Sequence, residues 1–188
     1  MKLFFDSVKI SRDGFTLSVN ETFQEGLHLF SGKVGSGKTT LALAAAGLLA
    51  PDAGVVRHDG FEGRPVLLMQ FPEYHVTGST VSEEIASWKV FGTEEPFGLL
   101  GVQTSDRDPI TLSRGELRRL ELACVFSREQ DLLILDEPYA SLDKSAKPIL
   151  TTLLEKRRGT TLVFSHETEN VPDNAEHWRI STGGVHHE

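Results

Sequence analysis

The segment LHLFSGKVGSGKTTLALAAAGLLA, residues 27–50, decides the fold class of this 188-residue chain. Its first five residues have the composition of a strand, and its middle is rich in glycine. Its last eleven residues predict a helix that is closed by Pro51. A strand that enters a helix through a glycine-rich turn is typical of βαβ folds. The segment therefore predicts an α/β protein.

The turn GKVGSGKT, residues 32–39, fits the pattern G-x-x-x-x-G-K-[ST] at every fixed position. Gly35 and Gly37 permit a tight turn whose backbone N–H groups approach phosphate oxygens, and the helix N-terminus adds a favourable dipole. Lys38 would supply a cation to the β- and γ-phosphates, and the Thr39 hydroxyl would ligate Mg²⁺. The alternative is a glycine-rich turn without a ligand. The lysine and threonine favour a nucleotide site made of Gly32, Lys33, Val34, Gly35, Ser36, Gly37, Lys38, Thr39 and Thr40.

An acidic pair ends the apolar stretch QDLLILDEP, residues 130–138, which predicts a strand buried on both faces. Asp136 is placed to hold magnesium through a water molecule. Glu137 is placed to accept a proton from, or to orient, the water that attacks the γ-phosphate. The alternative is a simple turn before a helix, but the phosphate-binding loop upstream favours the catalytic interpretation.

The rest of the chain predicts further strands and helices around this core. The first 30 residues alternate apolar and polar, which indicates short antiparallel strands at residues 2–10, 15–23 and 26–30. Two further strands are predicted at 54–60 and 65–71. After them the sequence pattern changes from strand-like to helical, so we expect an inserted helical lobe over about residues 71–111, with a helix in 79–91. A helix at 145–158, a buried strand at 160–166 and a hairpin at 176–188 complete a parallel βαβ sheet.

A helix start is predicted in LSRGELRRLELA, residues 112–123. Ser113 and Glu116 have the S-x-x-E spacing of a capping box. Leu117, Leu120 and Cys124 then fall on one face at helical spacing, as in an ordinary amphipathic core helix.

Composition limits the classes of function. A net charge of −8 argues against a nucleic-acid binder with a broad basic surface. The single Cys124 forms no internal disulfide, and no secretory signal or apolar run of about 18 residues is present. We therefore expect any membrane role to come through a partner, and no direct contact with nucleic acid.

Taken in order, these motifs resemble those of the ATP-binding cassette (ABC) ATPase family along nearly the whole chain. GKVGSGKTT resembles its Walker A motif and LLILDEP its Walker B motif with the adjoining glutamate. Gln70 resembles the Q-loop glutamine, LSRGE at 112–116 the signature, ASLD at 140–143 the D-loop and His166 the switch histidine. The resemblance implies one P-loop NTPase domain over residues 1–188, with a parallel RecA-like core, an N-terminal antiparallel β subdomain and the helical lobe.

The resemblance also implies an ATPase that uses ATP and Mg²⁺, with Glu137 and His166 as catalytic residues. Gln70 would reach the magnesium or the attacking water, so the metal ligands would be Thr39, Gln70 and Asp136. In this family two subunits close head to tail, so each ATP lies between one Walker A motif and the other subunit's signature. The residues that would act on the partner's ATP are Ser113, Arg114, Gly115, Glu116 and Asp143. Isolated monomers should hydrolyse ATP slowly.

The segment LLMQFPEYHVTGSTVSEEIA, residues 67–86, is similar to the glutamine-loop segment of energy-coupling-factor (ECF) importers. That similarity implies a cytoplasmic ATPase on the inner face of the membrane, in a homo- or heterodimer with a second ABC ATPase, that drives integral membrane subunits for vitamin or metal-ion uptake. The alternative is a soluble ABC ATPase that acts on nucleic acid or ribosomes. Either Arg12 or Phe15 would stack on the adenine.

Overall fold

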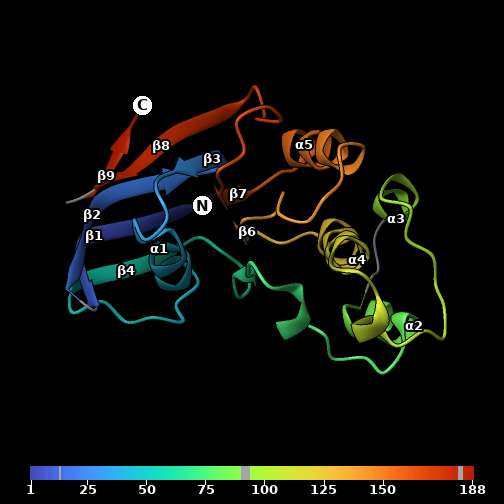
Figure 1. Cartoon of the computed structure of the whole chain (residues 1–188). Helices are drawn as coiled ribbons and strands as arrows, with labels where there is room; N and C mark the ends of the chain where they lie inside the picture. The colour runs from blue at the N-terminus through green and yellow to red at the C-terminus, as the bar shows by residue number, and fades with distance from the viewer. Residues whose placement is uncertain (13, 90–93, 182–183) are drawn as a thin grey trace.

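The structure, a computed structural model, describes residues 1–12, 14–89, 94–181 and 184–188. Within these residues the strands form two sheets, and the helices lie around them (Figure 1). The smaller sheet has the strand order β2-β1-β4 and is antiparallel. Its strands are β1 (Lys2–Arg12), β2 (Phe15–Gln24) and β4 (Ala53–Asp59).

The larger sheet has the order β5-β6-β7-β3-β8-β9 and is parallel from β5 to β8. Only β9 runs antiparallel within it, as the second strand of the predicted C-terminal hairpin. Residues 182–183 of the predicted hairpin lie outside the described residues. The strands are β3 (Gly26–Ser31), β5 (Val66–Leu68), β6 (Leu132–Asp136), β7 (Thr160–Phe164), β8 (Ala175–Ser181) and β9 (Gly184–His187).

One strand prediction was wrong in its pairing. The stretch at 26–30 was expected to join the antiparallel strands, but β3 lies between β7 and β8 and is parallel to both. Its residues Leu27, His28, Leu29 and Phe30 are all buried. A strand buried on both faces is suited to the middle of a parallel sheet rather than to a half-exposed antiparallel one.

The two faces of the larger sheet pack against different elements. Leu132, Ile134 and Phe164 face helix α1 (Lys38–Ala45) and the antiparallel sheet. Leu133 and Leu135 face the other way, toward helices α4 (Arg114–Phe126) and α5 (Ala146–Lys156). This alternation follows from the two-residue period of a strand, and it explains why β6 reads as a continuous apolar run.

The helical lobe lies beside α4, far from the antiparallel sheet (Figure 1). It contains α2 (Val81–Ser87), α3 (Glu95–Leu99) and the 3-10 turns η1 (Pro72–Tyr74) and η2 (Pro109–Thr111). Val81 packs with Leu117, Leu120 and Cys124 of α4, as the helical spacing predicted for that face. The helix predicted at 79–91 corresponds to α2, Val81–Ser87, and its last two predicted residues, 90 and 91, lie outside the described residues.

Two element boundaries differ from those predicted. The helix expected at 40–50 begins at Lys38 and ends at Ala45, because Gly47 adopts a positive φ of 72°. The strand expected at 65–71 is only Val66–Leu68, so Met69 and Gln70 lie in a loop. No helix in the described parts of the chain is long and apolar enough to cross a membrane.

Candidate nucleotide-binding site

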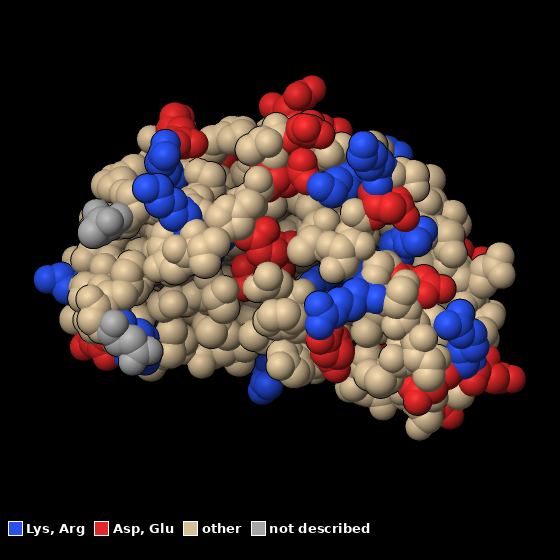
Figure 2. Space-filling view, viewed as in Figure 1, with Lys and Arg blue, Asp and Glu red and all other residues tan. Residues whose placement is uncertain are grey.

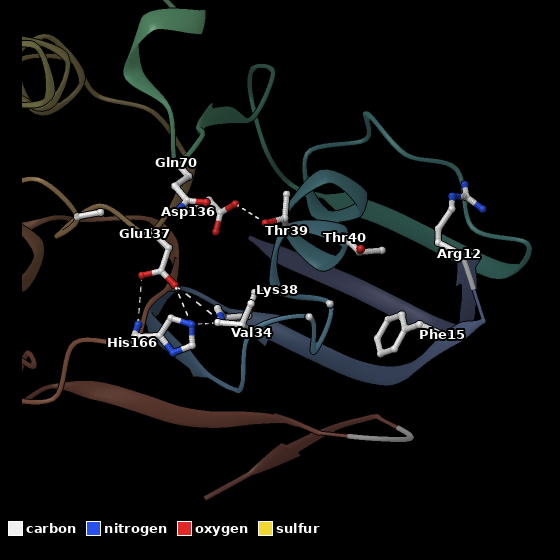
Figure 3. A pocket seen from close by; sticks show the side chains of 13 residues that line it. Arg12, Phe15, Val34, Lys38, Thr39, Thr40, Gln70, Asp136, Glu137 and His166 are labelled. Carbon is white, nitrogen blue, oxygen red and sulfur yellow. Dashed lines mark hydrogen bonds and ion pairs between the residues drawn. The ribbon is translucent and has the colours of Figure 1, made fainter. Parts of the chain in front are cut away.

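A pocket of about 470 Å³ lies at the carboxyl ends of four neighbouring parallel strands (Figure 3). The phosphate-binding loop follows β3, Gln70 follows β5, Asp136 ends β6 and His166 follows β7. In parallel sheets the carboxyl ends of the strands share one edge, which is where ligands bind. The sheet order therefore brings together residues that lie far apart in the sequence.

The loop 32–37 has the geometry of an anion site. Gly35 and Gly37 adopt positive φ values of 79° and 99°, which side chains rarely adopt. A Cβ atom at Gly37 would lie 2.7 Å from the ring of Phe15, so the glycine also permits this close packing. The Ser36 hydroxyl is buried without a hydrogen-bond partner among the described residues, and Ser36 is not one of those that line the pocket. The turn at the two glycines is therefore the feature that suits this loop to an anion.

Lys38 lies among the other reactive groups. Its Nζ donates to the Gly32 carbonyl at 2.9 Å and to the Lys33 carbonyl at 3.4 Å. It also lies 2.7 Å from His166 Nε2 and 3.9 Å from Glu137 Oε1. Burial lowers the pKa of Lys38, while the negative charges of Glu137 and Asp136 partly oppose that shift. The site therefore holds a partly desolvated cation, which strengthens its attraction for phosphate.

Thr39 and Asp136 provide two adjacent oxygen atoms. The Thr39 hydroxyl donates to Asp136 Oδ2 at 2.7 Å, and both residues line the pocket (Figure 3). Burial raises the pKa of Asp136, and the Thr39 hydrogen bond and the charges of Lys38 and Arg118 oppose the rise. A carboxylate and a hydroxyl are hard oxygen donors of the kind that Mg²⁺ prefers, so these residues fit the metal.

Glu137 and His166 contact each other at the open side of the pocket. Glu137 Oε2 accepts a hydrogen bond from the His166 backbone N–H at 3.2 Å, and Oε1 lies 3.4 Å from His166 Nε2. Glu137 adopts a positive φ of 50°, which turns its side chain away from the line of β6. Asp136 and Glu137 are thus neighbours in sequence that point toward separate partners, Thr39 and His166.

The predicted signature residues and the D-loop aspartate lie outside this pocket. Ser113, Arg114, Gly115, Glu116 and Asp143 are not among the described residues that line the nucleotide pocket. The predicted capping box is confirmed: Ser113 Oγ accepts from the Glu116 N–H at 3.3 Å, and Glu116 Oε2 accepts from the Ser113 N–H at 2.8 Å. These bonds lower the pKa of Glu116. The start of α4 is therefore closed by two reciprocal hydrogen bonds.

The D-loop packs directly against this helix start. A Cβ atom at Gly115 would lie 2.8 Å from the Ser141 carbonyl, so only glycine permits this approach without a shift. Arg119 pairs with Asp143 at 3.3 Å, and Asp143 also accepts hydrogen bonds from Ser145 and Ala146. The bonds from Ser145 and Ala146 lower the pKa of Asp143. The structure thus brings the signature and the D-loop together: Ala140 at the start of the D-loop lines the chain's own pocket, whereas Gly115, Ser141 and Asp143 do not.

Some predicted residues take a lesser part. The Lys33 side chain is exposed, and it is the Lys33 carbonyl that accepts a hydrogen bond from Lys38. Val34 lines the pocket and is 91% exposed. Arg12 and Phe15 both line the far end of the pocket, so the structure leaves either available to an adenine ring (Figure 3).

Two residues that hold loops of the site, Arg118 and Glu167, were not singled out from the sequence. Arg118 is fully buried under the loop at Met69 and Gln70, and its Nη2 donates to the carbonyls of both. Glu167 follows His166 and accepts a hydrogen bond from Lys147 of α5 at 2.5 Å. The available signal for Arg118 was its spacing of three residues from Glu121, which places the two opposite charges on one face of the helix.

The surface around the site carries mixed charge. On the face shown in Figure 2, blue and red side chains are interspersed rather than gathered into one broad basic area. Such a face gives little general attraction for a nucleic-acid backbone.

Known proteins resemble this chain in sequence and in fold. The profile of the ABC transporter family matches residues 17–140. The chain is 33% identical to ABC transporter I family member 11, chloroplastic, of Arabidopsis thaliana, over 92% of this chain and 73% of that protein. It is also 33% identical to the energy-coupling factor transporter ATP-binding protein EcfA1 of Thermotoga maritima, over 98% of this chain and 80% of that protein.

The fold also matches a solved structure, a dimeric ATP-binding cassette in a post-hydrolysis state with bound ADP and Pi. The TM-score is 0.78 at 18% identity, over 99% of this chain and 97% of that one. At this identity the likeness concerns the fold alone. It agrees with the predicted parallel core and antiparallel β subdomain.

Proposed function

This chain belongs to the ABC transporter family and binds and hydrolyses ATP, and from that premise we propose that it powers a membrane importer of the energy-coupling-factor type. The observation that carries the proposal is the 33% identity to EcfA1 of Thermotoga maritima over 98% of this chain. On this proposal the chain works on the cytoplasmic face, held there by integral membrane subunits. Vitamins or metal ions would be the cargo, bound by those other subunits.

We propose that the triphosphate binds along the loop 32–37 and the first turn of α1. Lys38 would leave His166 and Glu137 and place its charge against the β- and γ-phosphates. The N–H groups of the loop and of the N-terminus of α1 would donate to the phosphate oxygens. Arg12 or Phe15 would contact the adenine at the far end of the pocket.

Thr39, Asp136 and Gln70 would hold Mg²⁺. When bound, the ion neutralises charge on the β- and γ-phosphates during phosphoryl transfer. Asp136 is only 2% exposed, and its carboxylate is already held beside the Thr39 hydroxyl. These donors would therefore need little rearrangement to bind a cation.

Glu137 would take the proton of the attacking water, and His166 would hydrogen-bond the γ-phosphate. The side chains of Lys38, Glu137 and His166 contact one another. The three polar groups thus satisfy each other until a phosphate group enters between them. This exchange of partners supports hydrolysis that depends on correct placement of the γ-phosphate.

Ser113 and Gly115 would complete the site of a second ABC ATPase subunit. Their position outside the chain's own pocket supports a head-to-tail dimer, because the N-terminus of the 13-residue α4 carries a positive dipole suited to a γ-phosphate. Asp143 is held against Arg119 beside this surface and would lie at the same seam.

Affinity purification of the full-length chain from detergent-solubilised native membranes tests the transport proposal. Mass spectrometry should find an integral membrane protein and either a second ABC ATPase or only this one. Recovery from the soluble fraction with bound RNA or ribosomes would instead favour the nucleic-acid alternative and overturn the importer proposal.

Light scattering tests the dimer in the purified protein. The variant Glu137→Gln should associate in the presence of ATP, because it binds nucleotide and stalls before hydrolysis. The matched control is Glu137→Gln combined with Lys38→Ala, which should remain unassociated because phosphate binding is lost. Equal association of the two variants would count against ATP-dependent closure.

A further inference from the structure

The loop at Met69 and Gln70 is held by side chains. The strand β5 ends at Leu68, so Met69 and Gln70 are not part of the sheet. Gln70 lines the pocket. The Met69 N–H donates to His75 Nε2 at 2.9 Å. Arg118 Nη2 donates to the Met69 carbonyl at 2.9 Å and also to the Gln70 carbonyl. The side chains of His75 and Arg118 thus hydrogen-bond three backbone groups of this loop: the Met69 N–H, the Met69 carbonyl and the Gln70 carbonyl.

Arg118 reaches this loop from the helix that carries the signature. It lies in α4, one turn after the capping box, and is 1% exposed. Its Nη1 donates to Glu121 Oε2 at 3.2 Å, and Glu121 is also buried. The single guanidinium therefore joins the pocket loop to the helix whose N-terminus would serve the partner's site.

Packing alone does not account for this buried pair. Arg118 Nε and Glu121 Oε1 are buried without hydrogen-bond partners among the described residues. Burial also raises the pKa of Glu121 to about 8. Buried ion pairs often contribute little net stability, and apolar residues can replace them without loss. A pair with two unsatisfied atoms is therefore better explained by what it positions than by what it stabilises.

The surroundings of Arg118 favour the same interpretation. Its charge interacts with Asp136 at the end of β6 and with Glu73 in the turn after Gln70. The guanidinium therefore lies beneath the magnesium side of the pocket rather than beneath the adenine side. His75, which holds the other side of Met69, has a lowered pKa because it is buried and close to Arg118. It is thus kept neutral and able to accept the Met69 N–H.

We propose that Arg118 is a positioning residue that sets the backbone of the Gln70 loop, and so places the Gln70 side chain at the γ-phosphate side of the pocket. This rests on the role of Gln70 in the proposed function. Because the same arginine belongs to α4, movement of the loop on ATP binding is passed to the helix that carries Ser113 and Gly115.

Steady-state ATPase kinetics on purified protein test the proposal. Arg118→Lys keeps the positive charge but not the planar fork that serves two carbonyls, so kcat should fall about tenfold or more. Affinity for ADP, which lacks the γ-phosphate, should change by less than about twofold. In a Gln70→Ala background, Arg118→Lys should cause no further loss of kcat, because its effect passes through Gln70.

Two more variants separate positioning from folding. The double change Arg118→Met and Glu121→Met removes both buried charges, so it should fold and still show the Gln70-dependent loss of kcat. The matched control is Arg157→Met. Arg157 also donates to backbone carbonyls, those of Thr160 and Gln130, but these lie at the amino-terminal ends of β7 and β6, away from the pocket. This variant should lower stability and leave kcat unchanged.

Independent, additive losses from Arg118→Lys and Gln70→Ala would overturn the role of Arg118 while leaving that of Gln70 intact. An unchanged kcat in Gln70→Ala would overturn both. An ADP affinity that falls as much as kcat in Arg118→Lys would mean a general disturbance of the pocket and would also overturn the proposal.

Discussion

Replacing Glu167 by glutamine is expected to lower the free energy of unfolding at pH 7 by about 2 to 3 kcal/mol. The carboxylate accepts hydrogen bonds from Lys147 Nζ at 2.5 Å, from the Glu169 N–H at 3.1 Å and from Asn170. Burial opposes the charge, but these bonds prevail and lower the pKa of Glu167 from 4.5 to about 2. Each pKa unit corresponds to about 1.4 kcal/mol, which gives about 3 kcal/mol for the charged form. Glutamine keeps an acceptor oxygen, so Glu167→Gln should retain part of this stabilisation.

The sign of the pH dependence follows from the lowered pKa. The unfolded chain takes up its proton near pH 4.5 and the folded one only near pH 2, so the stabilisation is present above 4.5 and is lost as pH falls toward 2. The difference between wild type and Glu167→Gln should therefore shrink by about 1 kcal/mol between pH 7 and pH 4.

Urea denaturation of nucleotide-free protein, followed by tryptophan fluorescence at pH 7 and pH 4, measures this difference. The matched control is Glu169→Gln, which removes the same charge from an exposed side chain two residues away and should change little. Because Glu167 ties the loop after His166 to α5, its loss should also slow ATP hydrolysis. A Glu167→Gln variant as stable as wild type at pH 7, or a difference that is the same at both pH values, would refute the reasoning.

Three further changes probe the pocket and the helix start. Glu137→Gln should reduce kcat by about 100-fold or more while ATP binding is retained; turnover near that of wild type, measured by phosphate release, would contradict its assignment as the base. Lys38→Ala should weaken ATP binding by about 10- to 100-fold in calorimetry, because a charge-assisted contact is lost. Lys33→Ala, which removes an exposed cation from the same loop, is its control, and equal effects of the two would argue against a specific site. Ser113→Ala should lower the free energy of unfolding by about 1 kcal/mol in urea denaturation, whereas Ser113→Thr, which keeps the capping oxygen, should cost less.

The sequence alone determined the parts of this protein that depend on local backbone chemistry. Gly35 and Gly37 are required where the loop adopts positive φ, and their spacing to Lys38 and Thr39 is fixed by the turn into a helix. The capping box at Ser113 and Glu116 is equally local, because a side chain bonds a backbone group three residues away. The apolar run that ends at Asp136 indicated a strand buried on both faces.

Only the tertiary structure decided which of these pieces meet. Lys38 and His166 are 128 positions apart, and Thr39 and Asp136 are 97 apart, yet each pair is in hydrogen-bond contact because β3, β6 and β7 are neighbours in the sheet. Strand order is set by packing between distant segments, which a local pattern does not encode. For the same reason the local pattern predicts the wrong sheet for β3 and gives no sign that Arg118 contacts the loop after β5.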